Sequence, residues 1–197
     1  MKIVVSARSL QEAKADCDVV ELRLDLFDRL PAISEVEAIS KEKIVTVRRK
    51  DEGGLFEGSE EERLELMRKY ATVANYVDVE CDAHDDFFDM PCKIIESYHN
   101  FSETPPFETL RDMIEGRRGD IFKIATLGRD KRDVLTIVRI LCEYDNVVAF
   151  LMGEKFAYTR ILAVMLGSPF IYCHAGNAVA PGQLEAGKAR KILEMLL

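Results

Sequence analysis

Short apolar runs rich in β-branched residues recur eight times along this chain of 197 residues and alternate with helix-like segments. The runs are Lys2–Ser6, Val19–Leu24, Ile44–Arg48, Tyr76–Glu80, Lys93–Tyr98, Ile121–Ala125, Val147–Met152 and Phe170–Cys173. This alternation predicts parallel strands joined by helices. Eight units favour a closed (β/α)8 TIM barrel, and an open doubly wound sheet is the alternative. At this length the barrel is short, so we expect trimmed loops in a single domain over residues 1–197.

Helix starts between the runs carry capping boxes, in which a serine oxygen and a glutamate satisfy the free amides of the first turn. The three boxes are Ser9 with Glu12, Ser34 with Glu37, and Ser59 with Glu62. Thr104–Pro105 predicts a further helix start, because proline is tolerated in the first turn. An apolar stripe at helical spacing predicts the next helix and consists of Val134, Ile137, Val138 and Leu141.

Composition narrows the class of protein. Apolar residues make up 48% of the chain, as in globular proteins, and the net charge of −8 argues against nucleic acid as a partner. No apolar run is long enough for a membrane span and none resembles a signal peptide, so we expect a cytoplasmic protein. The five cysteines form no C-x-x-C pair, so we interpret them as reduced core residues.

Polar residues interrupt several runs near their carboxyl ends, although strands covered on both faces normally read as continuous apolar runs. Glu21, Arg23 and Asp25 alternate and therefore share one face of a strand. Arg48 ends the third run, Glu80 the fourth and Met152 the seventh. His99 follows the fifth run, and Lys123 lies inside the sixth. Salt bridges at the barrel rim are one interpretation. Recurrence at the end where barrels carry their active sites favours a functional site.

Lys123 and His99 are the leading catalytic candidates. The neighbours of Lys123 in its run are apolar, and a solvated strand face is the ordinary alternative. Inside a barrel, burial and nearby arginines disfavour the ammonium form, and a neutral amine is a nucleophile that forms an imine with a ketone. His99 suits acid–base work because histidine titrates near neutrality.

The other two histidines carry weaker signals. His84 lies in an acidic stretch and is expected at the surface, and His174 is expected in a loop or at the rim. A zinc site of His99, His174 and Glu80 is a minor alternative, because no ligand spacing such as H-E-x-x-H supports it. We therefore expect no metal.

Three arginines supply local positive charge for an anionic substrate: Arg23, Arg48 and Arg160. Arg160 follows the seventh run in a helical pattern, where an ordinary surface residue is the alternative. The segments Gly53–Gly54 and Pro181–Gly182 predict turns and match no nucleotide-binding motif. By themselves, the residues indicate an imine-forming barrel enzyme that acts on a small anionic ketone.

Five segments together resemble the type I 3-dehydroquinate dehydratase family. They are VVELRLDLF, VTVRRKDEGG, ESYHNFSETP, DIFKIAT and AVAPGQ, in the family's order across essentially the whole chain. The resemblance implies a TIM barrel that converts 3-dehydroquinate to 3-dehydroshikimate by syn elimination of water, the third step of the shikimate pathway to chorismate and the aromatic amino acids. The family uses a lysine Schiff base and requires no metal or organic cofactor.

The resemblance also assigns roles to individual residues. Lys123 matches the imine lysine, His99 the general acid/base, and Glu52 the carboxylate that orients this histidine. The residues that match the family's substrate contacts are Ser6, Glu21, Arg23, Arg48, Met152, Arg160 and Gln183. Among these, Arg160 matches the arginine that binds the substrate carboxylate.

Two positions depart from the family pattern. Val179 replaces the usual serine before A-P-G-Q and removes a donor for the substrate carboxylate, so more of its binding falls to Arg160. Tyr172 replaces what is often phenylalanine.

Two rival functions and the question of partners stay open. A class I aldolase also uses a strand-six lysine but usually binds phosphate. An inactive ligand-binding barrel would not need Lys123, His99 and Glu52 together. The expected partner is the small-molecule substrate alone, without nucleic acid or membrane. The family often forms homodimers, although trimmed elements here would remove surface for one.

Overall fold

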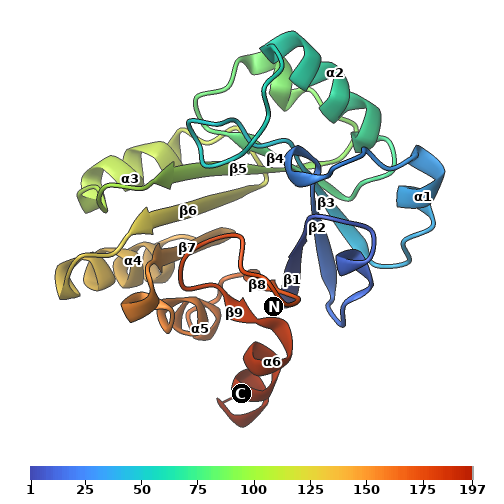
Figure 1. Ribbon diagram of the computed structural model, residues 1–197. Coiled ribbons are helices and arrows are strands. Elements are labelled where there is room, and N and C mark those ends of the chain that lie inside the picture. Colours follow the sequence, from blue (N-terminus) through green and yellow to red (C-terminus); the bar gives the residue numbers. More distant parts are fainter. Residues whose placement is uncertain (197) are drawn as a thin grey trace.

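One parallel sheet curls around a central axis in the computed structural model, which describes residues 1–196 (Figure 1). The strands are β1 (Lys2–Ala7), β2 (Val19–Arg23), β3 (Glu42–Thr46), β4 (Tyr76–Glu80), β5 (Lys93–Asn100), β6 (Ile121–Leu127), β7 (Val147–Met152), β8 (Phe170–His174) and β9 (Leu184–Glu185). Their order is β7-β6-β5-β4-β3-β2-β1-β8-β9, and neighbouring strands are parallel. Each predicted run overlaps a strand, and the predicted α/β barrel architecture is confirmed. The third run was predicted two residues too late, because β3 ends at Thr46 and Arg48 follows it.

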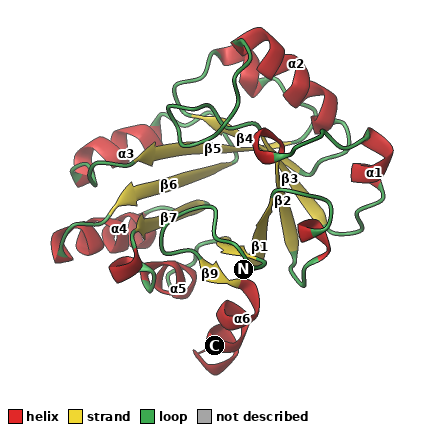
Figure 2. Cartoon of the chain, in the orientation of Figure 1, coloured by secondary structure: helices red, strands yellow, loops and turns green. Residues whose placement is uncertain are grey.

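Helices cover the outer face of the sheet (Figure 2). They are α1 (Ile33–Glu37), α2 (Glu60–Ala71), α3 (Phe107–Glu115), α4 (Lys131–Glu143), α5 (Thr159–Met165) and α6 (Ala186–Leu196). The 3-10 turns are η1 (Glu12–Lys14), η2 (Leu24–Leu26), η3 (Asp85–Phe88) and η4 (Glu154–Phe156). Two connections, between β1 and β2 and between β4 and β5, contain only such turns, which is how a barrel fits into this length.

The predicted capping boxes have mixed outcomes. The box of Ser59 and Glu62 is confirmed at the start of α2. The prediction at Ser34 is wrong, because α1 begins at Ile33 and the carboxylate of Glu35 accepts from the Ala32 amide at 2.7 Å.

The first predicted box and the Thr104–Pro105 start also need correction. The Ser9 hydroxyl accepts from the Glu12 amide at 3.2 Å, but the Glu12 carboxylate binds the side chain of Arg8 and only a 3-10 turn forms. The helix predicted from Thr104 begins three residues later, at Phe107.

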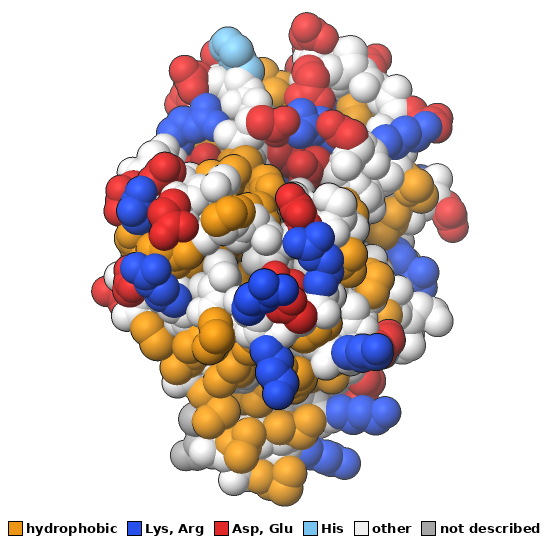
Figure 3. All heavy atoms as spheres, turned by 90° about the vertical axis from the view of Figure 1, so that its left-hand side faces the viewer, with side chains coloured by type: hydrophobic (Ala, Val, Ile, Leu, Met, Phe, Trp, Pro, Cys, Tyr) orange, Lys and Arg blue, Asp and Glu red, His pale blue; other side chains and the backbone are white. Residues whose placement is uncertain are grey.

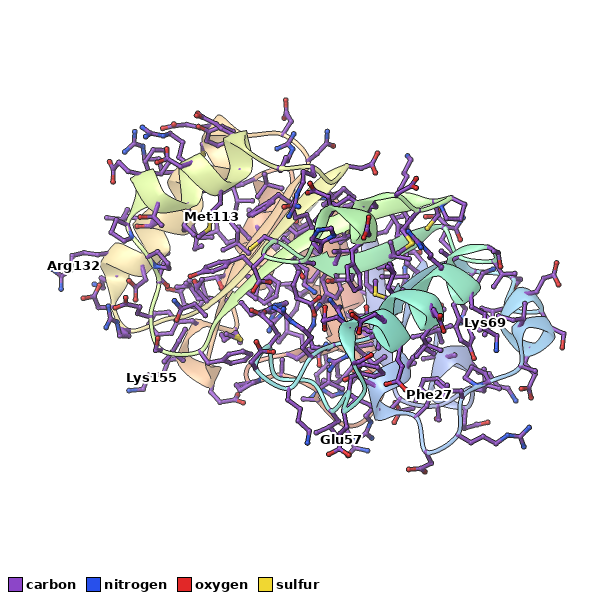
Figure 4. The ribbon with its side chains drawn as sticks, turned by 90° about the horizontal axis from the view of Figure 1, so that it is seen from above. Phe27, Glu57, Lys69, Met113, Arg132 and Lys155 are labelled. Carbon is purple, nitrogen blue, oxygen red and sulfur yellow. The ribbon has the colours of Figure 1, made fainter. Side chains whose placement is uncertain are left out.

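Two apolar layers hold the fold together. Inside the curled sheet, a layer of alternate strand residues is buried and includes Val4, Val19, Ile44, Ile95, Ile121 and Val148. Outside it, the opposite strand faces pack against the helices. Seen from above, side chains fill the centre, whereas Arg132 and Lys155 lie at the periphery (Figure 4). The polar strand residues that share this inner face are buried, and they are Ser6, Glu21, Arg23, Thr46, Asp78, Glu80, Ser97 and Lys123.

The ladder of strands has a seam, because β7 and β8 are not paired within residues 1–196. Helix α5 contacts both strands and covers this seam. The buried Thr159 hydroxyl of α5 accepts a hydrogen bond from the Leu151 amide of β7 at 3.0 Å. A side chain therefore satisfies an amide that a neighbouring strand would otherwise bind.

The surface mixes charges of both signs. On the face shown in Figure 3, acidic and basic side chains intersperse, and hydrophobic ones gather toward the end where α6 lies. No helix in the described chain is long and apolar enough to span a membrane. The cysteines in residues 1–196 are free, but Cys142 is exposed on the outer face of α4, so its assignment to the core is wrong.

Candidate active site

The predicted site residues line one pocket at the carboxyl ends of the strands, whose empty space is about 590 Å³ including the part that is open to solvent. Those predicted are Ser6, Glu21, Arg23, Arg48, Glu52, His99, Lys123, Met152, Arg160 and Gln183. Further lining residues are Gly53, Phe101, Ala125, Phe150, Tyr172, Val179, Ala180 and Pro181. Residues far apart in the sequence meet here because parallel strands end at the same edge.

Lys123 lies in the middle of β6 and is 5% exposed. Its Nζ donates to Oδ2 of Asp78 at 2.8 Å and lies 4.5 Å from the centre of the Tyr172 ring. The prediction of a free amine at Lys123 rested on burial and nearby arginines, which disfavour the ammonium form. It needs correction, because the amine is paired with Asp78, whose carboxylate favours the ammonium form.

Asp78 holds the centre of a buried polar cluster. Its Oδ1 accepts from Nη2 of Arg48 at 2.6 Å and from the Ser97 hydroxyl at 2.6 Å. Burial opposes ionisation of Asp78, but the charges of Arg48 and Lys123 prevail and hold its pKa well below the usual range. The anion at Asp78 therefore persists at every pH of physiological interest.

His99 and Glu52 form a second pair. The loop that carries Glu52 turns at Gly53, where φ is 77°, and at Gly54, where a Cβ would lie 2.1 Å from the Arg48 carbonyl oxygen. This turn brings Oε2 of Glu52 to 2.8 Å from Nδ1 of His99. The predicted turn at Gly53–Gly54 is thus confirmed.

Burial determines the charge of this pair. Desolvation, with the charges of Arg48 and Lys123, lowers the pKa of His99 well below its ordinary value. Desolvation also raises the pKa of Glu52 to about 7. Phe101 stacks over the imidazole with the ring centres 6.3 Å apart. A neutral imidazole therefore faces a carboxyl group that titrates near neutrality, which suits proton transfer.

Arg160 is a buried cation without a carboxylate partner among residues 1–196. It comes from α5, stacks on Phe150 at 3.9 Å, and donates to the carbonyl oxygens of Gly182 at 3.1 Å and Pro181 at 3.5 Å. Burial lowers its pKa to about 10. Its interpretation as an ordinary surface residue is wrong. A desolvated guanidinium at a pocket favours binding of an anion.

Arg23 differs from Arg160 because it already has a partner. Its Nε and Nη2 donate to the two oxygens of Asp25 at 2.9 and 2.8 Å. Asp25 lies in the turn η2 after β2, so the prediction that it shares a strand face with Glu21 is wrong. The salt-bridge interpretation therefore applies to Arg23 and Asp25 but not to Glu21.

Glu21 and Gln183 belong to a hydrogen-bonded wall. The carboxylate of Glu21 accepts from Ser6 at 2.6 Å and from Thr46 at 2.9 Å. Gln183 donates to the Cys173 carbonyl oxygen at 2.9 Å and to Ser6 at 3.3 Å, and its Oε1 accepts from the Val179 amide at 2.9 Å. Gln183 thus ties the last loop to the barrel and places Val179 at the pocket.

Several buried partners of the site were not predicted from the sequence: Thr46, Asp78, Ser97 and Arg63. Asp78 had a usable signal, since it alternates with Glu80 in β4 and so shares its face. Arg63 had no such signal, because charged residues are common in surface helices and nothing in the sequence marks this one as buried.

The remaining histidines stay apart from this pocket. His84 is exposed, as predicted, and His174 accepts from the Gly176 amide at 3.1 Å in the loop after β8. No cluster of three metal-ligating groups occurs in the part of the chain that is described. Both oxygens of Glu80 bind arginines, so nothing supports the zinc alternative.

The fold and pocket define this chain as a parallel α/β barrel with a polar pocket at the carboxyl ends of the strands, where enzymes of this architecture carry their active sites. The family described as type I 3-dehydroquinase matches residues 4–197. The chain belongs to this family, which confirms the resemblance found in the sequence.

Individual relatives agree with this assignment. A 3-dehydroquinate dehydratase of Archaeoglobus fulgidus is 54% identical over 200 residues, covering 100% of both chains. The crystal structure of the 3-dehydroquinate dehydratase from Aquifex aeolicus VF5 is 27% identical, with a TM-score of 0.78, and covers 100% of this chain and 99% of that one. The structure from Geobacillus kaustophilus HTA426 is 23% identical, with a TM-score of 0.86 over 99% and 90% of the chains, and shows the shared fold.

Proposed function

We propose that this protein is a 3-dehydroquinate dehydratase, a hydro-lyase that removes water from 3-dehydroquinate through an imine on Lys123. The observation that carries the proposal is the buried amine of Lys123 in the same pocket as the His99–Glu52 pair. Membership in the type I family supports the same reaction. The product, 3-dehydroshikimate, would enter the shikimate pathway to the aromatic amino acids.

The reaction would proceed through an imine and then an enamine. The neutral Lys123 amine adds to the ring ketone, and the resulting carbinolamine takes one proton from the solvent and loses its oxygen as water, which gives a protonated imine. The final hydrolysis returns this proton to the solvent. His99 removes a proton from the carbon next to the imine, and the electron pair moves to nitrogen as an enamine. The enamine expels the neighbouring hydroxyl, which takes a proton from His99 and leaves as water. Hydrolysis of the imine releases product and restores Lys123, so the net change is the loss of one water.

Asp78 is suited to a part in these steps that the family resemblance did not assign. Its carboxylate lies 2.8 Å from Nζ of Lys123 and stays ionised. The protonated imine carries the same charge as the ammonium it replaces. Asp78 would therefore stabilise this cation, which draws electrons from the reacting carbon, without moving between steps.

The other pocket residues would bind the substrate. Arg160 is the partner for the carboxylate, because it is a buried cation with no anion of its own in residues 1–196. Hydroxyl groups on the ring would meet a polar wall, and the side of the ring would pack on a methionine. The contacts we assign are Ser6, Glu21, Arg23, Arg48, Met152 and Gln183.

The reaction would need no organic cofactor or metal, because the imine supplies the electron sink. We further propose that residues 1–197 act as one catalytic domain on a free small molecule in the cytoplasm. An aldolase would need a phosphate site. Arg160 with backbone carbonyl oxygens around it suits a single carboxylate better.

The direct test is a dehydration assay. The conjugated product absorbs ultraviolet light, so purified protein mixed with 3-dehydroquinate should show rising absorbance at a rate proportional to protein concentration. Lys123→Ala and His99→Ala should each abolish it, whereas His84→Ala, at an exposed histidine, should not. No absorbance change with the parent protein would refute the proposal.

A further inference from the structure

Arg63 is a charged residue in a place that would accept an apolar one. It lies on α2, its side chain is fully buried, and its guanidinium stacks on Phe87 at 4.2 Å. It pairs with Glu60 through two hydrogen bonds, at 3.0 and 2.7 Å, and with Glu80 at 2.7 Å. It does not line the pocket. Burying this charge is costly unless it serves the groups that it touches.

Those groups form an unbroken chain of alternating charges that leads from the surface of α2 to the pocket. Consecutive members are joined at 2.7, 2.7, 2.9, 2.6 and 2.8 Å, and they are Glu60, Arg63, Glu80, Arg48, Asp78 and Lys123. Glu60 is half-exposed, and every later side chain is at most 6% exposed. Away from water, a charge at one end changes the energy of the other end more than it would at the surface.

Glu80 is the point at which Arg63 acts. One of its oxygens binds Arg63 and the other binds Nη1 of Arg48. If Arg63 loses its charge, Glu80 attracts Arg48 more strongly, and Arg48 then neutralises Asp78 less. Asp78 in turn favours the ammonium form of Lys123 more.

We propose that Arg63 is a positioning residue for the reaction, which keeps the Lys123 amine available by dividing the charge of Glu80 between two arginines. The proposal rests on the proposed function in so far as the amine is the nucleophile. It adds a residue outside the pocket to the machinery that controls this amine.

Other groups also face Lys123, and the variants below leave them in place. The charged and titratable groups around its amine are Glu21 and Arg23 from β2, Arg48 after β3, Asp78 from β4, His99 from β5 and Tyr172 from β8. Arg63 touches none of these except through Glu80. A change at Lys123 caused by Arg63 would therefore travel along the chain of charges.

The test measures the reactivity of the amine directly. Cyanate carbamylates only neutral amines, so mass spectrometry of the Lys123 peptide across a series of pH values reports the protonation of this residue. In Arg63→Met the pH of half-maximal modification should rise by about one unit, a tenfold change in the neutral fraction. In Glu80→Gln this pH should fall, because Asp78 is then the only carboxylate paired with Arg48 and is neutralised more fully. Opposite shifts are not expected from structural damage.

Matched variants complete the experiment. Arg68→Met removes an exposed arginine from the same helix and should leave the profile unchanged. Arg63→Lys keeps the charge and should stay near the parent profile, and Arg63→Met with Glu80→Gln should return toward it. At neutral pH, Arg63→Met should lower kcat about tenfold with little change in KM, since Arg63 does not touch the pocket.

Glu60→Gln probes the same chain from its exposed end if Arg63→Met does not fold. Glu60→Gln leaves Arg63 with Glu80 as its only carboxylate partner. The pH of half-maximal cyanate modification should therefore fall, but by less than in Glu80→Gln. Glu65→Gln is the control and should leave this pH unchanged. Identical profiles for all variants, or shifts in one direction only, would overturn the role of Arg63. Cyanate reports on the amine whether or not an imine forms, so failure of the imine mechanism would show separately, as an absence of borohydride labelling in the parent protein.

Discussion

The Nε atom of Arg160 donates a hydrogen bond to the carbonyl oxygen of Gly182 at 3.1 Å, which joins helix α5 to the loop after β8. The contact fixes the guanidinium at the pocket without neutralising it. Because a carbonyl oxygen carries no formal charge, the positive charge remains available to a ligand.

Arg160→Ala should therefore raise KM by at least about tenfold, a loss of about 1.4 kcal/mol of binding. Steady-state kinetics with 3-dehydroquinate measure this change in KM. Arg160→Lys should recover part of the loss, because it restores the charge but not the paired hydrogen bonds. Arg132→Ala, at an exposed arginine of α4, serves as control. A near-normal KM for Arg160→Ala would show that the carboxylate binds elsewhere.

Val179 lines the pocket without a donor in its side chain. Val179→Thr adds a hydroxyl at nearly constant shape, and Val179→Ser adds one with less bulk. Each should tighten substrate binding by about 1 kcal/mol, roughly fivefold, if the hydroxyl reaches the carboxylate. Val179→Ala controls for the loss of bulk. Unchanged binding in both hydroxyl variants would mean that this loop holds the position away from the carboxylate.

Glu52 holds Nδ1 of His99, so Glu52→Gln should misorient the imidazole. We expect kcat to fall about tenfold or more. The limb of the kcat/KM profile near pH ~7 that reports the Glu52 carboxyl should disappear, because glutamine does not titrate. Glu65→Gln, at an exposed carboxylate of α2, should leave both unchanged. A variant with the parent profile would remove Glu52 from the mechanism.

The same substitution has a signature in stability. Burial raises the pKa of Glu52 to about 7, whereas a carboxyl in the unfolded chain ionises near pH ~4.3. Between these values the folded protein keeps a proton that the unfolded chain releases, so the stabilising effect present at low pH is lost as the pH rises through this window. Relative to the parent, Glu52→Gln should be more stable at pH ~8 than at pH ~5 in urea unfolding. Glutamine does not titrate, so this difference between the two pH values reports the loss of the Glu52 carboxyl.

Lys123 and His99 have separable roles. Borohydride reduces an imine to a stable amine, so borohydride with substrate or product should inactivate the protein and place the added mass on the Lys123 peptide. Lys123→Ala should take no label. His99→Ala should still form the imine and accumulate more trapped adduct than the parent, because elimination stalls. A label on another lysine, or full activity after treatment, would exclude the imine assigned here.

Much of the fold was predictable because strands covered on both faces have a local signature. The runs at Tyr76–Glu80 and Val147–Met152 match β4 and β7 residue for residue. Helix starts were less predictable, because a cap depends on where the preceding loop delivers the chain. At α1 the carboxylate of Glu35, not that of Glu37, reaches a free amide.

The residues that line the site were predictable from the sequence, but the pairing of its charged groups was not. Lys123 was marked by its amine inside an apolar run, and His99 by its place directly after one. The pairing of Lys123 with Asp78 joins strands 45 positions apart, and no local pattern reports which of several carboxylates an amine will meet. The same holds for Arg63, whose partner Glu80 lies 17 positions away.

Two adjacent residues of α5 bind the two sides of the seam between β7 and β8. Thr159 binds the edge of β7 through Leu151, and Arg160 binds the loop after β8 through Gly182. An anion that engages Arg160 would therefore immobilise the segment that bridges the gap. Free energy gained by binding would appear as slower hydrogen exchange of the Leu151 amide. By reciprocity, the affinity for the anion would be lower when this edge is open, by the same factor by which the bound anion suppresses the opening.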